Sequence, residues 1–194
     1  MSLITVLRPD KPAEIPGSGP APHPAAVRTP IPDGSVLTLI DNGKSHAKIV
    51  LEMVAEQVMK RIPQITTVEI LSKTSAGLIV TDAQARDIAS RSALVITGLG
   101  DCGACSSCST LDAIAFEKLG IPATVIITDP FVGLVERFAK KAGMPGYHTV
   151  VLPHPMATRP DAEVRALVAG IADEVVAHLT APVGAVERTL VGVL

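Results

Sequence analysis

The sequence predicts a three-layer αβα sandwich built on a mostly parallel sheet of roughly five strands. Short apolar runs rich in β-branched residues recur along the chain, and each is followed by a segment with helical spacing. Strands that alternate with helices form parallel sheets covered on both faces, which explains why the runs are almost entirely apolar. Aromatic residues make up only 2% of the chain, so aliphatic side chains must fill the core.

The predicted elements alternate regularly from residue 35 onward. The runs that we predict to be strands lie at 36–40, 67–71, 93–97, 123–128 and 149–152. The segments that we predict to be helices lie at 45–61, 82–90, 109–119, 131–142 and 161–178. By analogy with doubly wound folds, we expect the strand order 2-1-3-4-5.

The ends of the chain differ from this α/β domain, which we assign to residues 35–180. Residues 1–34 hold eight of the sixteen prolines, and proline disfavours helix at its own position and at the preceding one. We therefore predict an extended N-terminal arm that docks on the surface, and the alternative is a disordered tail. Residues 181–194 form an apolar tail, and arm and tail together offer a contact for a homodimer.

Composition argues against several classes of partner. The formal net charge is −2, whereas nucleic acids and anionic membranes require a basic face, so we expect neither partner. No apolar run approaches the ~18 residues that span a bilayer, and the N-terminus lacks the pattern of a signal peptide. All three cysteines lie within seven residues, unlike a secreted disulfide framework, so we expect a cytoplasmic protein.

Residues that follow the predicted strands are the candidate site, because ligands of open parallel sheets bind beyond the carboxyl ends of the strands. The candidates other than the cysteines, in chain order, are Asn42, Lys44, Lys73, Asp101, Asp129 and His154. We predict that the first five bind substrate. Strand-to-helix loops are commonly polar, however, and a helix cap is the simpler interpretation of Asp129.

Two of these loops have a more specific interpretation. The N–H groups of the Asn42-Gly43-Lys44 turn, together with the lysine, can hold a carboxylate or a phosphate. The alternative is a simple turn with a solvated lysine. Two prolines flank His154 and fix its backbone, which suits a positioned acid–base group. The alternative is a loop histidine that only makes hydrogen bonds.

The cysteine cluster is the strongest functional signal. Cys102 and Cys105 form a Cys-x-x-Cys motif where the third predicted strand turns into a helix. A helix N-terminus favours a thiolate over a thiol, and the three-residue spacing lets two sulfurs meet. Cys108 follows at the same spacing. The simplest alternative is three small residues that pack a turn.

Three kinds of chemistry fit this cluster. In thiol redox chemistry, Cys102 attacks, Cys105 resolves and Cys108 assists. In covalent catalysis, a lyase, hydratase or transferase forms a thio-adduct, with His154 as acid or base. In a metal- or thiol-reactive binding protein, three sulfurs act as soft ligands, although Asp112 stands where an iron–sulfur motif needs a fourth cysteine.

A nucleotide cofactor is not expected. Glycines at 98, 100 and 103 lie near the third strand, but they do not meet the spacing of the dinucleotide fingerprint. They also follow the third strand, whereas that fingerprint belongs to the first. We therefore predict no cofactor.

The chain resembles the UGSC family of (seleno)proteins, named after a selenocysteine-Gly-Ser-Cys motif. The motif falls at 102–105, where Cys102 takes the place of selenocysteine and Ala104 stands in place of serine. The segments 39–44 and 151–155 also look like family segments, and the resemblance covers about residues 35–180. A selenocysteine at that place implies a reactive chalcogen of low pKa, although the family name fixes no substrate.

We therefore predict a thiol-dependent enzyme, with redox chemistry on a small molecule or a disulfide as the favoured activity. The predicted catalytic residues are Cys102, Cys105, Cys108 and His154. The expected partners are the small-molecule substrate or a thiol reductant.

Overall fold

The sheet has five strands, all parallel, in the order β2-β1-β3-β4-β5. The computed structural model describes residues 20–182. The strands are β1 (Ser35–Asp41), β2 (Ile65–Ser72), β3 (Leu94–Gly100), β4 (Ala123–Thr128) and β5 (Val150–Leu152). This is the flavodoxin-like order of doubly wound folds, so the predicted strand order is confirmed.

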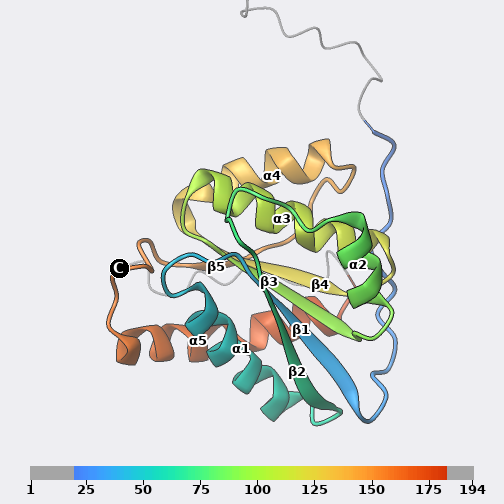
Figure 1. The fold of residues 1–194 in the computed structure, drawn as a ribbon, viewed down its shortest axis with the longest axis horizontal. Helices are drawn as coiled ribbons and strands as arrows, with labels where there is room; N and C mark the ends of the chain where they lie inside the picture. The colour runs from blue at the N-terminus through green and yellow to red at the C-terminus, as the bar shows by residue number, and fades with distance from the viewer. Residues whose placement is uncertain (1–19, 183–194) are drawn as a thin grey trace, which may run out of the picture.

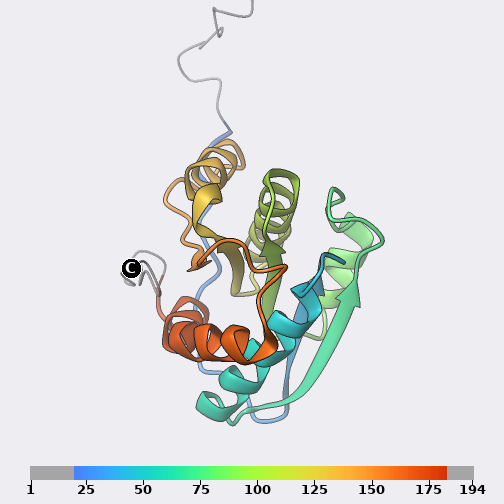
Figure 2. The ribbon, with the colours of Figure 1, turned by 90° about the vertical axis from the view of Figure 1, so that its left-hand side faces the viewer.

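Helices cover both faces of the sheet, as Figures 1 and 2 show. The helices are α1 (Ala47–Arg61), α2 (Asp82–Ala89), α3 (Gly103–Lys118), α4 (Val132–Lys141) and α5 (Asp161–Thr180), and a short 3₁₀ turn, η1 (Asp129–Phe131), precedes α4. Helices α1 and α5 pack on one face and α2, α3 and α4 on the other, and each face has its own aliphatic core. The predicted three-layer sandwich is confirmed.

The central strands explain the apolar runs in the sequence. Every residue of β3, β4 and β5 is buried, because helices cover these strands on both faces. The edge strand β2 instead exposes several of its residues. The centre of the sheet is therefore a fixed platform, and the turn that follows β3 leaves from its middle.

The structure corrects the predicted boundaries around this turn. Strand β3 runs to Gly100 rather than to residue 97, and α3 begins at Gly103 rather than at residue 109. The turn therefore consists of Asp101 and Cys102 alone. Serines disfavour helix interiors because their hydroxyls compete for backbone groups. Here Ser106 and Ser107 donate instead to carbonyls four residues earlier, at 2.7 and 2.8 Å, and stay within the helix.

Part of the proline-rich arm lies within the described residues and contacts the domain. The Arg28 guanidinium donates twice to the Glu117 carboxylate, with both distances 2.7 Å, and also to the His178 carbonyl. The backbone N–H groups of Ala26 and Ala123 bind the same carboxylate. Residues 26–28 therefore lie where β4 begins, at the amino end of the sheet. Residues 1–19 of the arm and 183–194 of the tail lie outside the described residues.

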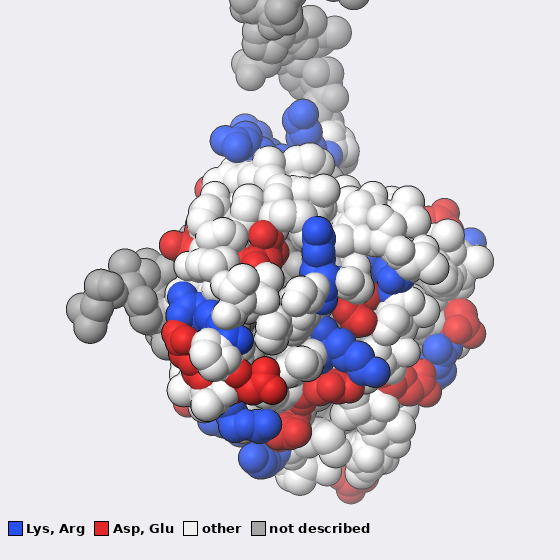
Figure 3. Space-filling view, turned by 60° about the vertical axis from the view of Figure 1, so that its left-hand side comes forward, with Lys and Arg blue, Asp and Glu red and all other residues white. Residues whose placement is uncertain are grey.

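The surface and the helices bear on the partner predictions. Basic and acidic side chains are interspersed on the face drawn in Figure 3. Within residues 20–182, none of the helices combines the length and apolar character required to cross a bilayer.

Candidate functional site

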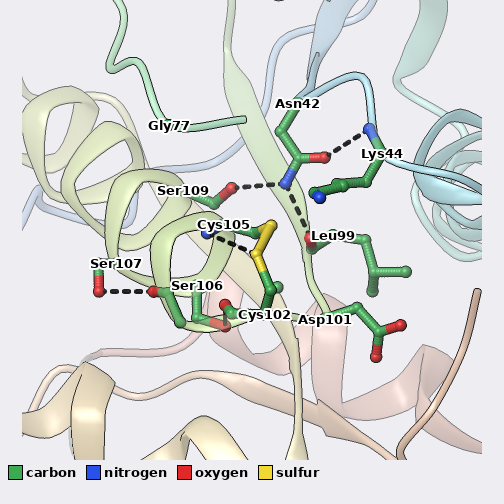
Figure 4. The surroundings of a disulfide bond; sticks show 12 residues. Asn42, Lys44, Gly77, Leu99, Asp101, Cys102, Cys105, Ser106, Ser107 and Ser109 are labelled. Atoms are coloured by element: carbon green, nitrogen blue, oxygen red, sulfur yellow. Dashed lines mark hydrogen bonds between the residues drawn. A yellow bond between two sulfur atoms is a disulfide. The ribbon is translucent and has the colours of Figure 1, made fainter. Parts of the chain in front are cut away.

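The cysteine motif forms the first turn of α3. Cys102 and Cys105 are joined by a disulfide, and Cys102 is the N-cap residue of the helix (Figure 4). The Cys102 sulfur accepts a hydrogen bond from the backbone N–H of Cys105 at 3.2 Å. Cys102 is half-buried, whereas Cys105 is completely buried. Attack from solvent is therefore directed to Cys102, whose sulfur also lies in the positive field of the helix N-terminus.

Close packing holds this turn against the sheet. A Cβ atom at Gly100 would lie 2.7 Å from both Ile127 Cγ2 and Ser106 Oγ. Only glycine therefore lets α3 approach β3 and β4 this closely. The position of the cysteine pair follows from this contact, because Gly100 precedes Cys102 by two residues.

The pair opens onto a cleft of about 310 Å³, which is near the lower end of the size range for small-molecule sites. Three loops at the carboxyl end of the sheet form it. The lining residues are Asn42, Gly43, Lys44, Lys73, Thr74, Ser75, Ala76, Gly77, Cys102, Ala104 and Cys105. The structure thus brings together five of the residues singled out in the sequence: both members of the cysteine pair, Asn42 and the two lysines.

Asn42 lines the cleft but uses its amide internally. Its Nδ2 donates to the Leu99 carbonyl at 2.8 Å and to Ser109 Oγ at 3.3 Å, and its Oδ1 accepts from the Lys44 backbone N–H. The side chain therefore ties the β1 loop to β3 and α3, as Figure 4 shows. Its main role in this geometry is to hold the loop that carries Lys44.

The two lysines of the cleft differ in their partners. The Lys73 ammonium is 2.5 Å from Asp112 Oδ2 and 2.7 Å from the Leu78 carbonyl, and both members of the ion pair are buried. Burial raises the pKa of the Asp112 carboxyl, and the hydrogen bond from Lys73 opposes that rise. Lys44 is exposed, and within residues 20–182 its ammonium has no ion pair or side-chain hydrogen bond. Lys44 is thus the cation of the cleft that is open to a ligand.

Cys108 lies beyond the cleft, one further turn along α3. It is a free thiol, partly buried, and it does not line the cleft. Burial raises the pKa of the Cys108 thiol, the nearby charge of Asp112 adds to the rise, and Lys73 opposes it. Cys108 therefore differs from the other two cysteines in its surroundings, although all three are spaced equally in the sequence.

The remaining candidates form a second group beside the first, around the ends of β4 and β5. The Asp101 carboxylate is 2.9 Å from His154 Nδ1 and accepts the backbone N–H groups of Met156 and Ala157. Asp129 Oδ1 accepts the His154 backbone N–H at 2.9 Å. Both carboxylates therefore position the loop that carries the histidine, and neither lines the cleft.

Sequence reasoning missed three contributors to the site. Thr128 lies 3.1 Å from His154 Nδ1 through its hydroxyl, and Asp112 pairs with Lys73. The segment 74–77 forms one wall of the cleft. The sequence did contain an indication for Asp112, because this residue follows Cys108 by one helical turn and so lies on the same face of the helix.

Within residues 20–182, no group of three or more Cys, His, Asp or Glu side chains is arranged to hold a metal ion.

The fold and the site together define a class: a parallel α/β protein with a cysteine pair at the N-terminus of the helix that follows its central strand. The chain belongs to the UGSC family, whose model matches residues 5–181. The resemblance stated from the motifs is thereby confirmed. It also extends further than expected, since the match includes most of the proline-rich arm.

Comparisons with other proteins add little beyond the family. The curated proteins gave no match. Among solved structures, a diflavin flavoprotein A3 from Nostoc sp. has a TM-score of 0.40 and 11% identity, over 75% of this chain and 96% of that one. A flavodoxin-like domain from Synechococcus sp. has a TM-score of 0.38 and 9% identity, over 72% and 97%. Neither likeness bears on what this chain binds.

Proposed function

We propose that this protein is a thiol–disulfide oxidoreductase that acts on a small molecule bound in the cleft. One observation carries the proposal: the disulfide between Cys102 and Cys105 lines the cleft, with the half-buried cysteine capping α3 and the other fully buried. A thiolate at that sulfur is stabilised by the helix N-terminus and by the N–H of Cys105. The half-buried cysteine is then the nucleophile, and the buried one resolves.

The proposed cycle begins with both cysteines reduced. The Cys102 thiolate attacks one sulfur of a substrate disulfide, R–S–S–R, and forms a mixed disulfide while one R–S⁻ leaves and takes up a proton. The Cys105 thiol loses its proton and attacks Cys102, which forms the intramolecular disulfide and releases the second R–SH. The substrate gains two electrons and the cysteine pair loses two. A dithiol reductant, which we expect in the cytoplasm, returns the pair to its starting state.

His154 does not line the cleft, so we propose that it carries the proton to the leaving thiolate through solvent. Its Nδ1 contacts Asp101 and Thr128, so the ring is oriented and Nε2 remains for exchange with solvent. The side chain is 36% exposed, so it is partly open to solvent. Asp101, Thr128 and Asp129 are positioning residues in this proposal, because they act through the histidine and its loop.

Trapping the mixed disulfide tests the proposal. The protein is reduced, freed of reductant and given bis(2-hydroxyethyl) disulfide, and intact mass and released thiol are measured. We expect the wild type to release two molecules of mercaptoethanol per chain and to keep no adduct. Cys105→Ser should release one and keep a mercaptoethanol adduct on Cys102, because no resolving thiol remains. Cys102→Ser should form no such adduct on the pair.

The comparison variant is Cys108→Ser, which keeps both members of the pair. It should not accumulate the adduct, because Cys105 is present to resolve it. Failure of the reduced wild type to release mercaptoethanol, with no adduct on Cys102 in Cys105→Ser, would contradict the redox cycle and leave a lyase, hydratase or transferase that uses Cys102 alone. Metal bound stoichiometrically by the reduced protein, with no thiol released, would favour a metal-binding protein instead.

A further inference from the structure

The charge around the cleft is uneven. Among residues 20–182, two lysines line it, whereas no aspartate or glutamate does. The charge of Lys73 is balanced by Asp112 at 2.5 Å, and this pair lies buried with the carboxylate completely covered. Among the described side chains that line the cleft, Lys44 therefore carries the one charge that no ion pair balances. The nearby Asp41 carboxylate is buried, where it accepts the Gly43 N–H and the Ser72 hydroxyl, and it does not line the cleft.

The backbone around Lys44 is fixed even though its side chain is exposed. Its N–H donates to Asn42 Oδ1 at 3.2 Å, and the preceding Gly43 has a φ of +75°. A Cβ atom at Gly43 would lie 3.0 Å from the Lys73 carbonyl, so the turn is also packed against the next loop. Figure 4 shows the Lys44 side chain extending from this turn back toward Asn42 and the disulfide. The ammonium is thus presented to the cleft by a constrained turn.

We propose that the substrate carries a carboxylate that is bound by Lys44 while its reacting atom faces Cys102. A single unbalanced ammonium matches one negative charge, as on a carboxylate, better than the nearly double charge of a phosphate. The volume of about 310 Å³ suits a small organic acid rather than a peptide or a nucleotide. The proposal deepens the proposed function, since it takes the sulfur of Cys102 as the reacting atom.

Two alkylating reagents test carboxylate recognition at this sulfur directly. Iodoacetate and iodoacetamide both alkylate a thiolate with loss of iodide. Iodoacetate carries a carboxylate, whereas iodoacetamide carries a neutral amide in the same place. The rate of each is measured at Cys102 of the reduced protein by peptide mass spectrometry, relative to a short cysteine peptide. The rate with iodoacetate is divided by the rate with iodoacetamide, and this ratio is compared between Cys102 and the peptide. At low salt we expect the ratio to be about five times larger at Cys102, which is the effect of one partly exposed ion pair.

Substitutions assign the effect to the lysine. The ratio should fall to about that of the peptide in Lys44→Met and remain raised in Lys44→Arg, which keeps the charge. The matched control is Lys48→Met on α1, because Lys48 is also exposed but contacts Glu52 and does not line the cleft. It should leave the ratio at its wild-type value. A wild-type ratio near that of the peptide, or an equal ratio in wild type and Lys44→Met, would overturn the proposal.

This readout separates the proposal from the redox cycle. Alkylation requires only an accessible Cys102 thiolate, so it reports on carboxylate binding even where no disulfide is reduced. Reduction of dithiodiglycolate is then compared with that of the neutral bis(2-hydroxyethyl) disulfide and the cationic cystamine. Failure to reduce any of the three contradicts the redox function and leaves the alkylation ratio to decide on Lys44. Equal reduction of all three, with no alkylation preference, contradicts the carboxylate proposal alone.

Discussion

The two ends of helix α3 contrast in how they use polar groups. At its last turn, the Glu117 carboxylate accepts four hydrogen bonds from the Arg28 guanidinium and two backbone N–H groups, all at 2.7–2.8 Å. At its first turn, Cys102 is half-buried at a cleft, and the ammonium of Lys44, which lines the same cleft, has no ion pair in the described chain. Polar groups that are buried and fully bonded hold structure, whereas those left accessible are available for chemistry.

The largest expected effect is at the buried end. Arg28→Met leaves the Glu117 carboxylate buried without its counter-ion, which should lower the free energy of unfolding by about 3–5 kcal/mol in urea denaturation. The control is Arg61→Met, whose partner Asp173 is exposed, and it should cost less than about 1 kcal/mol. Similar losses in the two variants would show that the Arg28 pair does not fix the arm. Replacing both Arg28 and Glu117 by Met should cost less than Arg28→Met alone.

A smaller loss is expected at the reactive end. Gly100→Ala places a methyl group 2.7 Å from Ile127 and Ser106, so overpacking should destabilise the fold by about 1–3 kcal/mol. Gly133→Ala on α4 meets no atom within 4 Å and should stabilise by about 0.5–1 kcal/mol, since alanine favours a helix. Thermal and urea unfolding of both variants would measure the difference. Effects of the same sign would contradict close packing at the cysteine turn.

The smallest effect concerns the two accessible thiols of α3. Because burial raises the pKa of Cys108, its thiolate fraction at a given pH is lower than that of an ordinary cysteine. Its alkylation by iodoacetamide should therefore be slower than that of a cysteine peptide at pH 8, and its rate profile should lie toward higher pH. Cys102 in the reduced protein should react faster than Cys108 at pH 7. Both rates are measured by peptide mass spectrometry. Faster alkylation of Cys108 than of Cys102 would contradict the view that the cysteine pair is more reactive than the third cysteine.

The sheet could be predicted because its buried strands are largely apolar runs that alternate with helices, whereas its order was an analogy with doubly wound folds. The start of α3 could not, because four hydroxyl residues there favour non-helical backbone on local grounds. Three of their hydroxyls donate to carbonyls four residues earlier in the turn and helix, as Thr110 does to the Ser106 carbonyl, whereas the Ser109 hydroxyl accepts from Asn42. Helix formation at this point is imposed by packing against β3 and β4, which the local pattern does not encode.

For the candidate site, the rule about carboxyl ends of strands pointed to the edge of the sheet where the structure has the cleft. It did not distinguish groups with internal partners from groups without them. Lys73 is neutralised by Asp112, and Asn42 is bound to the Leu99 carbonyl, and both partners are distant in sequence. Thr128 was missed because a threonine at the end of a strand has no distinguishing pattern. Which lysine remains open is a property of tertiary structure.

The span of the disulfide has a consequence for how the protein tolerates changing conditions. Its two cysteines are only three positions apart, so the bond closes a very short loop and removes little freedom from the unfolded chain. The first turn of α3 already orders the same residues through backbone contacts such as the bond from Ser106 N–H to the Cys102 carbonyl. The melting temperature should therefore be lower by only a few degrees in reducing buffer than in oxidising buffer. A shift in the thiol balance of the cell would change the reactivity of this protein without changing how much of it is folded.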